Sequence, residues 1–492
     1  MKAAILFTLG FLFPAMPVRG ADPEPAAIDR LMNDALKQWD APGAALVIVR
    51  DDRIVYLQGY GRKHIDKPEP VTPDTVFPLA SCTKAFTSTL IATLVDEGEM
   101  RWDDPVRKHL PAFHLSDPNA DAMVSMRDLL SHRTGVGTHD LLWYRAPWDT
   151  DELLKRVGKL PLEYPFRGGY AYSSIMYIAA GKAASDRAKE PWQTLVKARL
   201  TDPLGMKATY FTTTDVSAEV LASGHERKDG HVKFTPGLEF AEPNPAGSMH
   251  SSARDIAAWL RFQLSNGKTA DGQRLVSERN LLETRSPQSI IPLAGANGEQ
   301  NPDTTLMCYC MGWVKYDYRG KKITAHGGIV DGFRIQLTIV PEENLAFAVL
   351  SNLYEPRMTQ AVSNALIDRF CGLSERDWNG FYLKFRDDAD AAAKAAIEAR
   401  DKARNPNRKP SLAVDGYAGT YENPAYGTAK VTAKDGKLEL HWSSFRVPME
   451  PFEGDAFRIP GGFFAEQFVE FAVKPGQGTT ALRFAGMVFE KK

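Results

Sequence analysis

The residues of this chain best placed to do chemistry are Ser81 and Lys84, in the segment Ser-Cys-Thr-Lys. Apolar residues follow them at helical spacing, namely Phe86, Leu90, Ile91, Leu94 and Val95. This spacing predicts a helix that begins near the serine. Residues three apart share one face of a helix, so the serine Oγ and the lysine Nζ are expected to face each other. A weak nucleophile then lies beside a base at the positive end of the helix dipole, an arrangement typical of acyl transfer.

The Ser-x-x-Lys pattern is short enough to occur by chance, and serine is also a favoured helix N-cap. A second match, Ser265-Asn266-Gly267-Lys268, lies where a helical pattern ends in Asn-Gly, which is a turn signal. We interpret this second match as chance. The choice between nucleophile and ordinary cap for Ser81 therefore depends on other segments.

Two other segments carry groups that suit acyl transfer. Tyr172 begins a Tyr-Ser-Ser segment that ends at Ser174. A buried tyrosine near a lysine can act as an acid or base, although a lone tyrosine is more often a core residue. His326 is followed by two glycines at the end of a strand pattern, where a substrate can lie against the strand edge. The next backbone N–H, that of Ile329, is a candidate oxyanion donor. Residues 129–135 are interpreted as scaffold, with His132 outside the chemistry.

Other chemistries have little support in the sequence. There is no Gly-x-Ser-x-Gly elbow, no His-Glu-x-x-His among the 10 histidines, and no Gly-x-x-x-x-Gly-Lys loop. We therefore expect no metal and no cofactor. Lysine plus arginine (60) nearly equals aspartate plus glutamate (61), without a long basic run, so no nucleic-acid partner is expected.

The elements that must position these residues follow a β–helical–β order. Residues 26–39 predict an amphipathic helix, and residues 44–50 and 53–60 a β-hairpin. A mostly helical region covers residues 81–264. Strands return later, and a last helix is predicted at 358–370; the strands are expected at 311–318, 322–326, 333–340 and 345–351. The economical arrangement is one antiparallel sheet built from both ends and flanked by helices, with a helical subdomain between. The site is expected where the sheet meets that subdomain.

A second domain is predicted after the one that carries these residues. Residues 373–410 are expected to be a helical spacer and linker, alanine-rich and charged, ending in a Pro/Asn-rich stretch. Residues 411–492 show only short strands and turns, with a strong hairpin signal at Asp435-Gly436. This pattern predicts a small all-β barrel-like domain. The sequence leaves open whether this domain caps the cleft or forms a homo-oligomer.

The N-terminus predicts export. Lys2 precedes an apolar run over residues 3–13, and small residues before Ala21 suggest a signal peptide of residues 1–20. The protein is thus expected to be periplasmic or secreted, without a stable membrane span. The alternative is an N-terminal membrane anchor. The four cysteines (Cys82, Cys308, Cys310 and Cys371) are expected to be free thiols rather than disulfides.

Together these segments resemble the serine hydrolases of the class C β-lactamase, DD-peptidase and family VIII esterase group. The order Ser-x-x-Lys, then a Tyr-x-Asn type motif, then Lys- or His-x-Gly matches, and residues 129–135, 202–206 and 246–255 are similar to the same group. The resemblance covers about residues 25–370 and implies a β-lactamase/transpeptidase-like α/β domain over residues 25–372. The last domain resembles the lipocalin-like domains of some exported members.

The resemblance implies a role for each residue. Ser81 would be the acylated nucleophile, and Lys84 and Tyr172 would share the base role, with neither favoured. The N–H groups of Ser81 and Ile329, beside Gly328, would form the oxyanion hole. His326 would stand where many relatives have lysine, orienting the substrate or the tyrosine. Ser174 replaces the group's usual asparagine.

The expected function is that of an exported serine hydrolase that cleaves an ester or amide through a Ser81 acyl-enzyme. A hydroxyl reaches less far than a carboxamide, so Ser174 favours an ester or a small D-amino-acid amide over a β-lactam or a peptide. One alternative is a penicillin-binding DD-peptidase or β-lactamase. The other is a non-catalytic ligand-binding relative. The expected partner is a small-molecule or peptide substrate.

Overall fold

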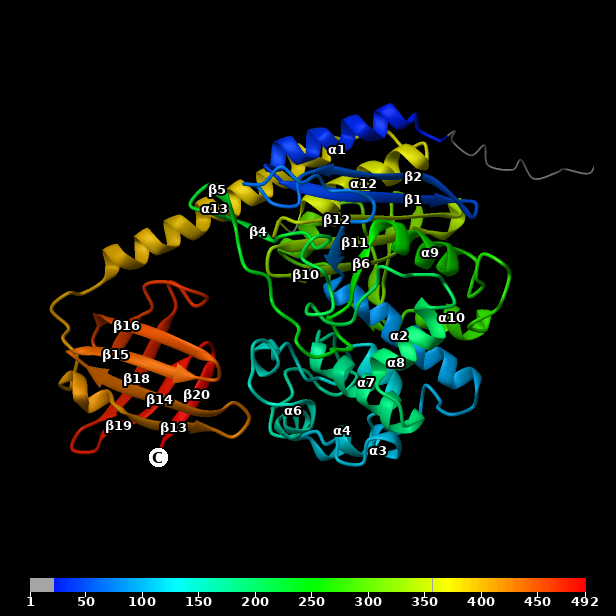
Figure 1. Cartoon of the computed structure of the whole chain (residues 1–492). Coiled ribbons are helices and arrows are strands. Elements are labelled where there is room, and N and C mark those ends of the chain that lie inside the picture. The colour runs from blue at the N-terminus through cyan, green and yellow to red at the C-terminus, as the bar shows by residue number, and fades with distance from the viewer. Residues whose placement is uncertain (1–21, 356) are drawn as a thin grey trace, which may run out of the picture.

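An eight-stranded antiparallel sheet forms the centre of the larger domain (Figure 1). The computed structural model describes residues 22–355 and 357–492, so the predicted signal peptide lies outside the described residues. The sheet order is β2-β1-β12-β11-β10-β9-β8-β7, so the N-terminal hairpin pairs with the last strand of the domain, as predicted. The strands are β1 (Gly43–Arg50), β2 (Arg53–Gly61), β7 (Ser289–Ile290), β8 (Met307–Tyr309), β9 (Val314–Tyr318), β10 (Lys321–Val330), β11 (Phe333–Val340) and β12 (Leu345–Ser351).

Strand β1 shows why helices cover both faces of the sheet. All eight of its residues are buried, and successive side chains of a strand point to opposite faces. Val47 and Val49 belong to the core that includes α2 (Thr83–Asp96) and α9 (Ala253–Leu264). Leu46 and Ile48 belong to the core that includes α1 (Pro25–Trp39) and α12 (Met358–Phe370). The predicted α/β class, with an antiparallel sheet flanked by helices, is confirmed.

The segment between β2 and β7 builds the helical subdomain. Its helices are α3 (Val106–His109), α4 (Pro118–Met123), α5 (Met126–Leu130), α6 (Thr150–Val157), α7 (Ser174–Ala188), α8 (Trp192–Val196) and α10 (Glu278–Thr284), with α2 and α9 already given. Two small sheets interrupt it, one of β3 (Val76–Pro78) and β6 (His250–Ser252), the other of β4 (His225–Lys228) and β5 (His231–Phe234). Short helical turns and α11 complete the domain: η1 (Ala80–Cys82), η2 (Asp140–Leu142), η3 (Lys197–Thr201), α11 (Ala296–Gln300) and η4 (Pro341–Glu343).

The prediction for β10 was wrong at its C-terminal end. The strand was expected to end at His326, but it continues through two glycines to Val330. A Cβ on Gly328 would lie 2.2 Å from the carbonyl oxygen of Leu79. The glycine therefore lets the strand press against the turn that precedes Ser81, and this tertiary contact outweighs the low strand preference of glycine.

A long helix leads from the larger domain to a closed eight-stranded barrel (Figure 1). Helix α13 (Trp378–Ala403) is anchored at its start, where Trp39 Nε1 donates to Asn379 Oδ1 at 2.9 Å. The Asp435-Gly436 hairpin is confirmed, with φ of 52° and 72°. The barrel follows η5 (Val414–Tyr417) and comprises β13 (Gly419–Asn423), β14 (Gly427–Lys434), β15 (Lys437–Trp442), β16 (Phe445–Glu453), β17 (Ala456–Arg458), β18 (Phe468–Lys474), β19 (Gly478–Phe484) and β20 (Met487–Lys491).

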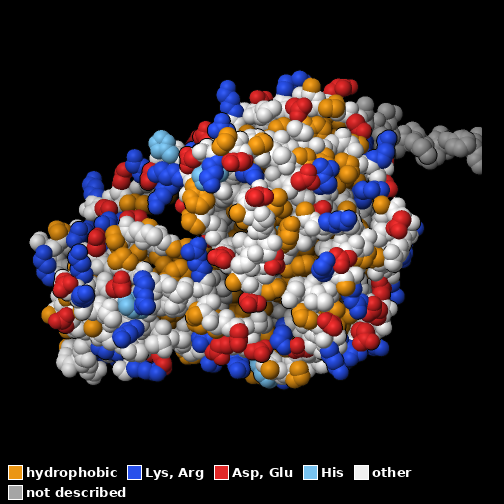
Figure 2. All heavy atoms as spheres, viewed as in Figure 1, with side chains coloured by type: hydrophobic (Ala, Val, Ile, Leu, Met, Phe, Trp, Pro, Cys, Tyr) orange, Lys and Arg blue, Asp and Glu red, His pale blue; other side chains and the backbone are white. Residues whose placement is uncertain are grey.

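Three further features bear on the predictions. The four cysteines are free thiols, as expected, and all but Cys371 are buried. Across the described parts of the chain, none of the helices combines the length and apolar character needed to cross a bilayer. The face shown in Figure 2 mixes acidic and basic side chains rather than gathering one sign. This mixture agrees with the near-equal charge totals of the sequence.

Candidate active site

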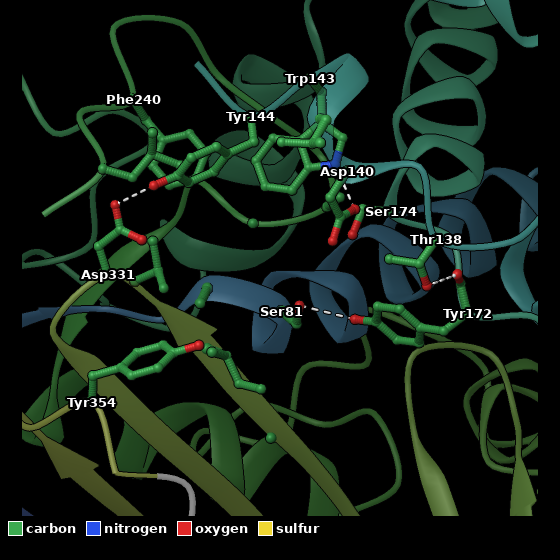
Figure 3. A pocket seen from close by; sticks show the side chains of 18 of the residues that line it. Ser81, Thr138, Asp140, Trp143, Tyr144, Tyr172, Ser174, Phe240, Asp331 and Tyr354 are labelled. Atoms are coloured by element: carbon green, nitrogen blue, oxygen red, sulfur yellow. Dashed lines mark hydrogen bonds between the residues drawn. The ribbon is translucent and has the colours of Figure 1, made fainter. Parts of the chain in front are cut away.

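Ser81 lies in η1, in the tight connection between β3 and α2. The residue before it, Ala80, has φ of 47°, in the left-handed region that non-glycine residues rarely adopt. Such a backbone costs on the order of 1–3 kcal/mol and persists only where the surroundings hold it. Here the N–H of Leu79 donates to the carbonyl of Met249 at 2.7 Å. The strained turn directs the Ser81 side chain into a cavity (Figure 3).

The alcohol, amine and phenol singled out from the sequence meet at Ser81. Lys84 Nζ lies 3.0 Å from Ser81 Oγ, and the Tyr172 hydroxyl lies 2.9 Å from the same oxygen. Tyr172 comes from the loop before α7, about ninety positions further along the chain. Figure 3 shows its ring directed at the serine. This convergence matches the expected nucleophile with two candidate proton-transfer partners.

Lys84 is fully buried, and its environment favours the neutral amine. Burial lowers the pKa of Lys84 to about 7, although the charge of Asp140 acts in the opposite direction. Besides Ser81, Nζ contacts the Ala246 carbonyl at 2.9 Å and Ser174 Oγ at 3.4 Å. A neutral amine has two N–H donors and one lone pair. When the two N–H groups donate to the Ala246 carbonyl and to Ser174 Oγ, the lone pair is left to accept from the hydroxyl of Ser81.

Tyr172 is suited to donate a proton. Burial raises the pKa of Tyr172 well above its usual value, although the hydrogen bond with Ser81 acts against that rise. The phenol therefore stays protonated at neutral pH and donates to Ser81 Oγ. Its backbone carbonyl accepts from Thr138 Oγ1 at 2.7 Å. The sequence left the base role open between Lys84 and Tyr172; the pKa is lowered for Lys84 and raised for Tyr172, which favours Lys84 as the proton acceptor.

His326 lines the same cavity but does not hydrogen-bond to Tyr172 in the described structure. Its Nδ1 lies 2.7 Å from the Gly327 carbonyl, which only accepts, so Nδ1 carries the proton. Nε2 then accepts from the Tyr309 hydroxyl at 3.0 Å. Burial lowers the pKa of His326 to about 3, with the Lys84 charge acting in the same direction. His326 is thus neutral, and the ring of its partner Tyr309 lies edge-on to that of Tyr172, with centroids 6.2 Å apart.

Strand β10 presents an open edge to the cavity. Its pairing with β9 ends at Ala325, whereas its pairing with β11 continues to Val330 opposite Phe333. Ile329 lies on this edge, lines the cavity and is 48% exposed. Gly328 lies beneath, against the backbone of Leu79. The predicted residues Gly328 and Ile329 thus lie beside the turn that holds Ser81.

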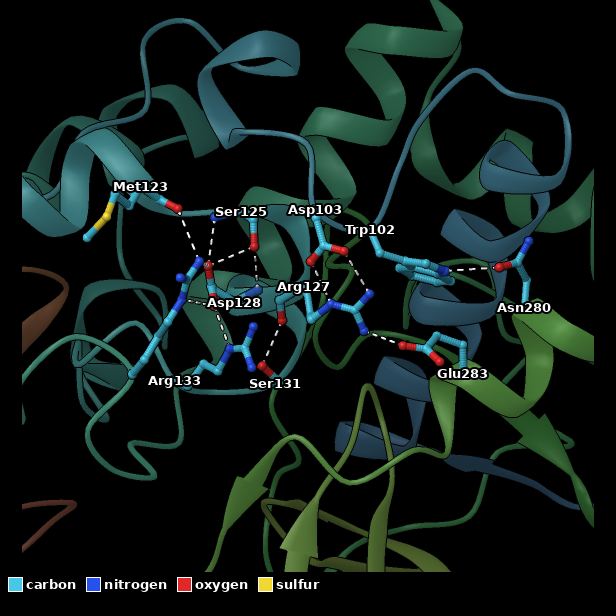
Figure 4. A network of polar contacts seen from close by, with 11 residues as sticks. Trp102, Asp103, Met123, Ser125, Arg127, Asp128, Ser131, Arg133, Asn280 and Glu283 are labelled. Atoms are coloured by element: carbon cyan, nitrogen blue, oxygen red, sulfur yellow. Dashed lines mark hydrogen bonds and ion pairs between the residues drawn. The ribbon is translucent and has the colours of Figure 1, made fainter.

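The segment expected to be scaffold belongs to a network of polar contacts around Asp128 (Figure 4). Asp128 is fully buried and accepts hydrogen bonds from the Ser125 hydroxyl at 2.7 Å, from Arg133, and from Arg167 Nη2 at 2.7 Å. Burial alone would raise the pKa of Asp128, but these hydrogen bonds and the arginine charges lower it overall. His132 Nδ1 accepts from the Ser173 N–H at 3.1 Å. These contacts hold the loop that carries Tyr172 on the end of α5.

Most of the cavity wall was not foreseen from the sequence. The cavity measures about 830 Å³ and is rich in aromatic side chains from distant segments, chiefly Trp143, Tyr144, Phe240, Tyr309 and Phe463. A second hollow of about 990 Å³ adjoins it and shares Trp143, Leu238 and Phe240. The only signal in the sequence was a Leu-Leu-Trp-Tyr run at residues 141–144, which has no periodicity that would place it at a site.

Comparison with known proteins assigns the fold. Residues 28–370 match the Beta-lactamase family. The chain belongs to this family. Residues 403–490 match a domain of unknown function, DUF3471. Among curated proteins, the chain is 27% identical to "Unguisins hydrolase ungD" of Aspergillus violaceofuscus over 501 residues, covering 93% of this chain and 87% of that protein.

Solved structures share the architecture. The octameric penicillin-binding protein homologue from Pyrococcus abyssi matches 95% of this chain and 99% of its own, with a TM-score of 0.63 and 19% identity. The D-amino acid amidase from Ochrobactrum anthropi SV3 matches 70% of this chain and 96% of its own, with a TM-score of 0.57 and 24% identity. The predicted resemblance is confirmed, and the protein is a β-lactamase-related serine hydrolase.

The site of this family member has an acidic wall. Asp140 and Asp331 line the cavity, whereas none of its described lining residues is a lysine or arginine. Asp331 accepts from the Tyr144 hydroxyl at 2.5 Å and pairs with Arg145 at 3.0 Å. Asp140 accepts from Trp143 Nε1 at 2.7 Å. Within the described ranges, no group of three or more His, Cys, Asp or Glu residues is arranged to hold a metal ion.

Proposed function

We propose that this protein hydrolyses an uncharged or cationic ester or amide through an acyl-enzyme on Ser81. The observation that carries the proposal is the pair of contacts at Ser81 Oγ, 3.0 Å to Lys84 Nζ and 2.9 Å to the Tyr172 hydroxyl. A base near neutrality and a protonated phenol at one oxygen are what acyl transfer needs. Retention of all three groups argues against the non-catalytic ligand-binding alternative.

The proposed acylation is a displacement at the substrate carbonyl. Ser81 Oγ forms a bond to the carbonyl carbon while its proton passes to Lys84 Nζ. The bond from that carbon to the leaving oxygen or nitrogen then breaks, and the leaving atom takes a proton from the Tyr172 hydroxyl or the Lys84 ammonium. Water repeats the sequence on the acyl-enzyme and releases the acid. General acid–base steps of this kind contribute roughly 10²–10⁴ in rate.

The oxyanion hole is proposed to consist of the N–H groups of Ser81 and Ile329. The register of β10 and β11 supports the second donor. Val330 and Phe333 flank a two-residue turn, so the next pair, Ile329 and Arg334, is a non-hydrogen-bonded pair of the ladder. The N–H of Ile329 then points away from β11, toward the open edge and the cavity.

The charge of the cavity argues against the penicillin-binding peptidase or β-lactamase alternative. β-Lactams and D-Ala-D-Ala peptides carry a carboxylate, and a carboxylate needs a cation or several donors in its site. This cavity is lined by the carboxylates of Asp140 and of Asp331, of which Asp331 is paired with Arg145. The position where many relatives have lysine holds the neutral His326. A neutral ester or an amide with a free amine avoids that repulsion. Both the fungal hydrolase and the amidase named above have names consistent with ester or amide cleavage.

A substrate comparison tests this proposal. We expect kcat/KM for p-nitrophenyl butyrate to exceed that for benzylpenicillin and for a D-Ala-D-Ala peptide by at least about tenfold, because only the latter two place a carboxylate in an acidic cavity. Replacing Asp140 by asparagine should lower the ratio of kcat/KM for the ester to kcat/KM for the two carboxylate substrates by about fivefold, because one negative charge is removed from the cavity. Efficient turnover of the penicillin by the unaltered protein, with no gain in Asp140→Asn, would overturn the charge argument.

Export and self-association stay predictions. We propose that residues 1–20 are removed and that the protein is periplasmic or secreted; N-terminal sequencing of protein from the extracellular or periplasmic fraction should begin at Ala21, and an intact Met1 would refute cleavage. The barrel is proposed to support a homo-oligomer, because the penicillin-binding protein homologue from Pyrococcus abyssi, which shares this architecture, is an octamer. A monomer mass by light scattering would contradict that proposal.

A further inference from the structure

The C-terminal barrel contributes directly to the wall of the cavity that holds Ser81. Phe463, Phe464, Gln467 and Ala485 all line it. The first three come from the β17–β18 connection, and the last from the turn between β19 and β20. They lie some four hundred positions along the chain from the nucleophile. A domain that merely trailed behind the hydrolase would leave this wall to solvent.

Two sets of contacts hold the barrel in this place. At the cavity rim, His139 Nδ1 lies 2.6 Å from the Tyr426 hydroxyl, and Arg156 Nη1 of α6 donates to the Ala425 carbonyl at 2.9 Å. In the β17–β18 connection, Glu466 pairs with Arg400 of α13 at 2.7 Å. His139 stands between Thr138 and Asp140, which both line the cavity. The barrel therefore touches the loop that forms the adjacent wall as well as the cavity itself.

Aromatic side chains of the barrel and of the larger domain pack against each other at the cavity. The Phe463 ring stacks on Tyr144, with centroids 5.1 Å apart and an interplanar angle of 25°. The Tyr144 hydroxyl in turn donates to Asp331 in the β10–β11 turn at 2.5 Å (Figure 3). Phe463 is 56% exposed, although it lines the cavity. An exposed apolar ring in the cavity that holds the nucleophile can be covered by an apolar part of the substrate, and this burial would stabilise the complex.

The interior of the barrel is not a candidate binding site for a substrate group. Large inward-facing side chains fill it, among them Tyr421, Trp442 and Phe489, none of which is more than 1% exposed. Side chains that pack a small barrel leave its outer loops as the surface for other contacts. The loops that carry Phe463 and Ala485 are the parts that reach the active site.

We infer that the barrel completes the substrate site, with Phe463 and Tyr144 forming a subsite for an uncharged aromatic or branched aliphatic group of the substrate. This inference rests on the proposed function and adds a specificity-determining residue to it. It assigns the barrel a role in binding the substrate, whether or not the barrel also forms an oligomer.

The first test compares two esters that share a leaving group, p-nitrophenyl acetate and p-nitrophenyl 4-phenylbutyrate. In Phe463→Ala the ratio of kcat/KM for the phenylbutyrate to that for the acetate is expected to fall about tenfold, because the larger acyl group loses an apolar contact. The matched control is Val488→Ala, which truncates a barrel residue that is 43% exposed and outside the cavity lining. Its ratio should equal that of the unaltered protein. An unchanged ratio in Phe463→Ala overturns the inference, as does an equal loss on both esters.

The second test does not depend on turnover. Neutral 4-phenylbutyramide is titrated into full-length Ser81→Ala protein by calorimetry, with and without Phe463→Ala. We expect the second substitution to weaken binding about tenfold. Equal affinity, or the absence of binding in both proteins, overturns the subsite. Absent ester turnover combined with the expected weakening would instead refute the proposed function and leave the subsite in place.

Discussion

Replacing Ser81 by alanine is expected to abolish covalent labelling by a fluorescent fluorophosphonate and to lower kcat/KM for p-nitrophenyl butyrate by about 10⁴-fold or more. The hydroxyl is the atom that both Lys84 and Tyr172 address, at 3.0 and 2.9 Å. Without this hydroxyl, there is no nucleophile with which Lys84 or Tyr172 can exchange a proton. The fold should persist, because the deleted oxygen lies on a cavity wall rather than in a packed core. An unchanged thermal midpoint checks this point.

The chain supplies its own matched control for that experiment. Ser265 begins the second Ser-x-x-Lys match, and its hydroxyl is engaged in a turn, where it accepts from the Lys268 N–H at 3.2 Å. Ser265→Ala should leave labelling and turnover unchanged. Labelling that survives in Ser81→Ala, or that disappears in Ser265→Ala, would place the nucleophile elsewhere. Loss in Ser81→Ala alone would exclude a ligand-binding protein without catalysis.

Local periodicity explains why the centre of the site was predictable. Ser81 and Lys84 are three residues apart at a helix start, and helix geometry alone brings their side chains together. Tyr172 could be named as a candidate acid or base from its residue type, but only the family resemblance placed it beside Ser81, because no local rule links residues ninety positions apart. The hairpin at Asp435-Gly436 was also predictable from local sequence, because these two residue types favour the positive φ that the turn demands and that both positions adopt.

The rest of the site depends on how distant parts dock. His326 was expected to orient the substrate or Tyr172; it lines the cavity, but its Nε2 accepts from Tyr309, a residue with no motif around it, rather than from Tyr172. Phe463 reaches the cavity only because the barrel packs against the loop at 138–144. Such contacts follow from side-chain conformations and domain placement, and neither leaves a periodic signal in the sequence. The extension of β10 through its glycines is another case in which tertiary contact overrides local preference.

The pH profile is expected to identify Lys84 as the base. With the pKa of Lys84 lowered to about 7, kcat/KM should rise tenfold per pH unit in acid and level off above about pH 7. If Tyr172 were the base, the rate would still climb in strongly alkaline solution, because burial raises its pKa well above the usual value. A profile without a plateau near neutrality would therefore reject Lys84. The measurement is kcat/KM for p-nitrophenyl butyrate at constant ionic strength.

Substitution of Lys84 adds a second, independent consequence. Lys84→Met should lower kcat/KM by about 10²–10⁴-fold and remove the acidic limb of the profile, since no group of pKa about 7 remains beside Ser81.

The same substitution should change how stability depends on pH. A lysine in the unfolded chain has a pKa of ~10.4. Between these two pKa values the unfolded chain binds more protons than the folded one, so the free energy of unfolding should rise with pH in that window. Lys84→Met should flatten this rise as measured by urea unfolding, whereas the matched Lys268→Met variant, whose lysine is exposed, should retain both the rise and the activity. A variant that lost activity but kept the full rise in stability would mean that Lys84 is not held near neutrality in the fold, and the case for it as the base would fail.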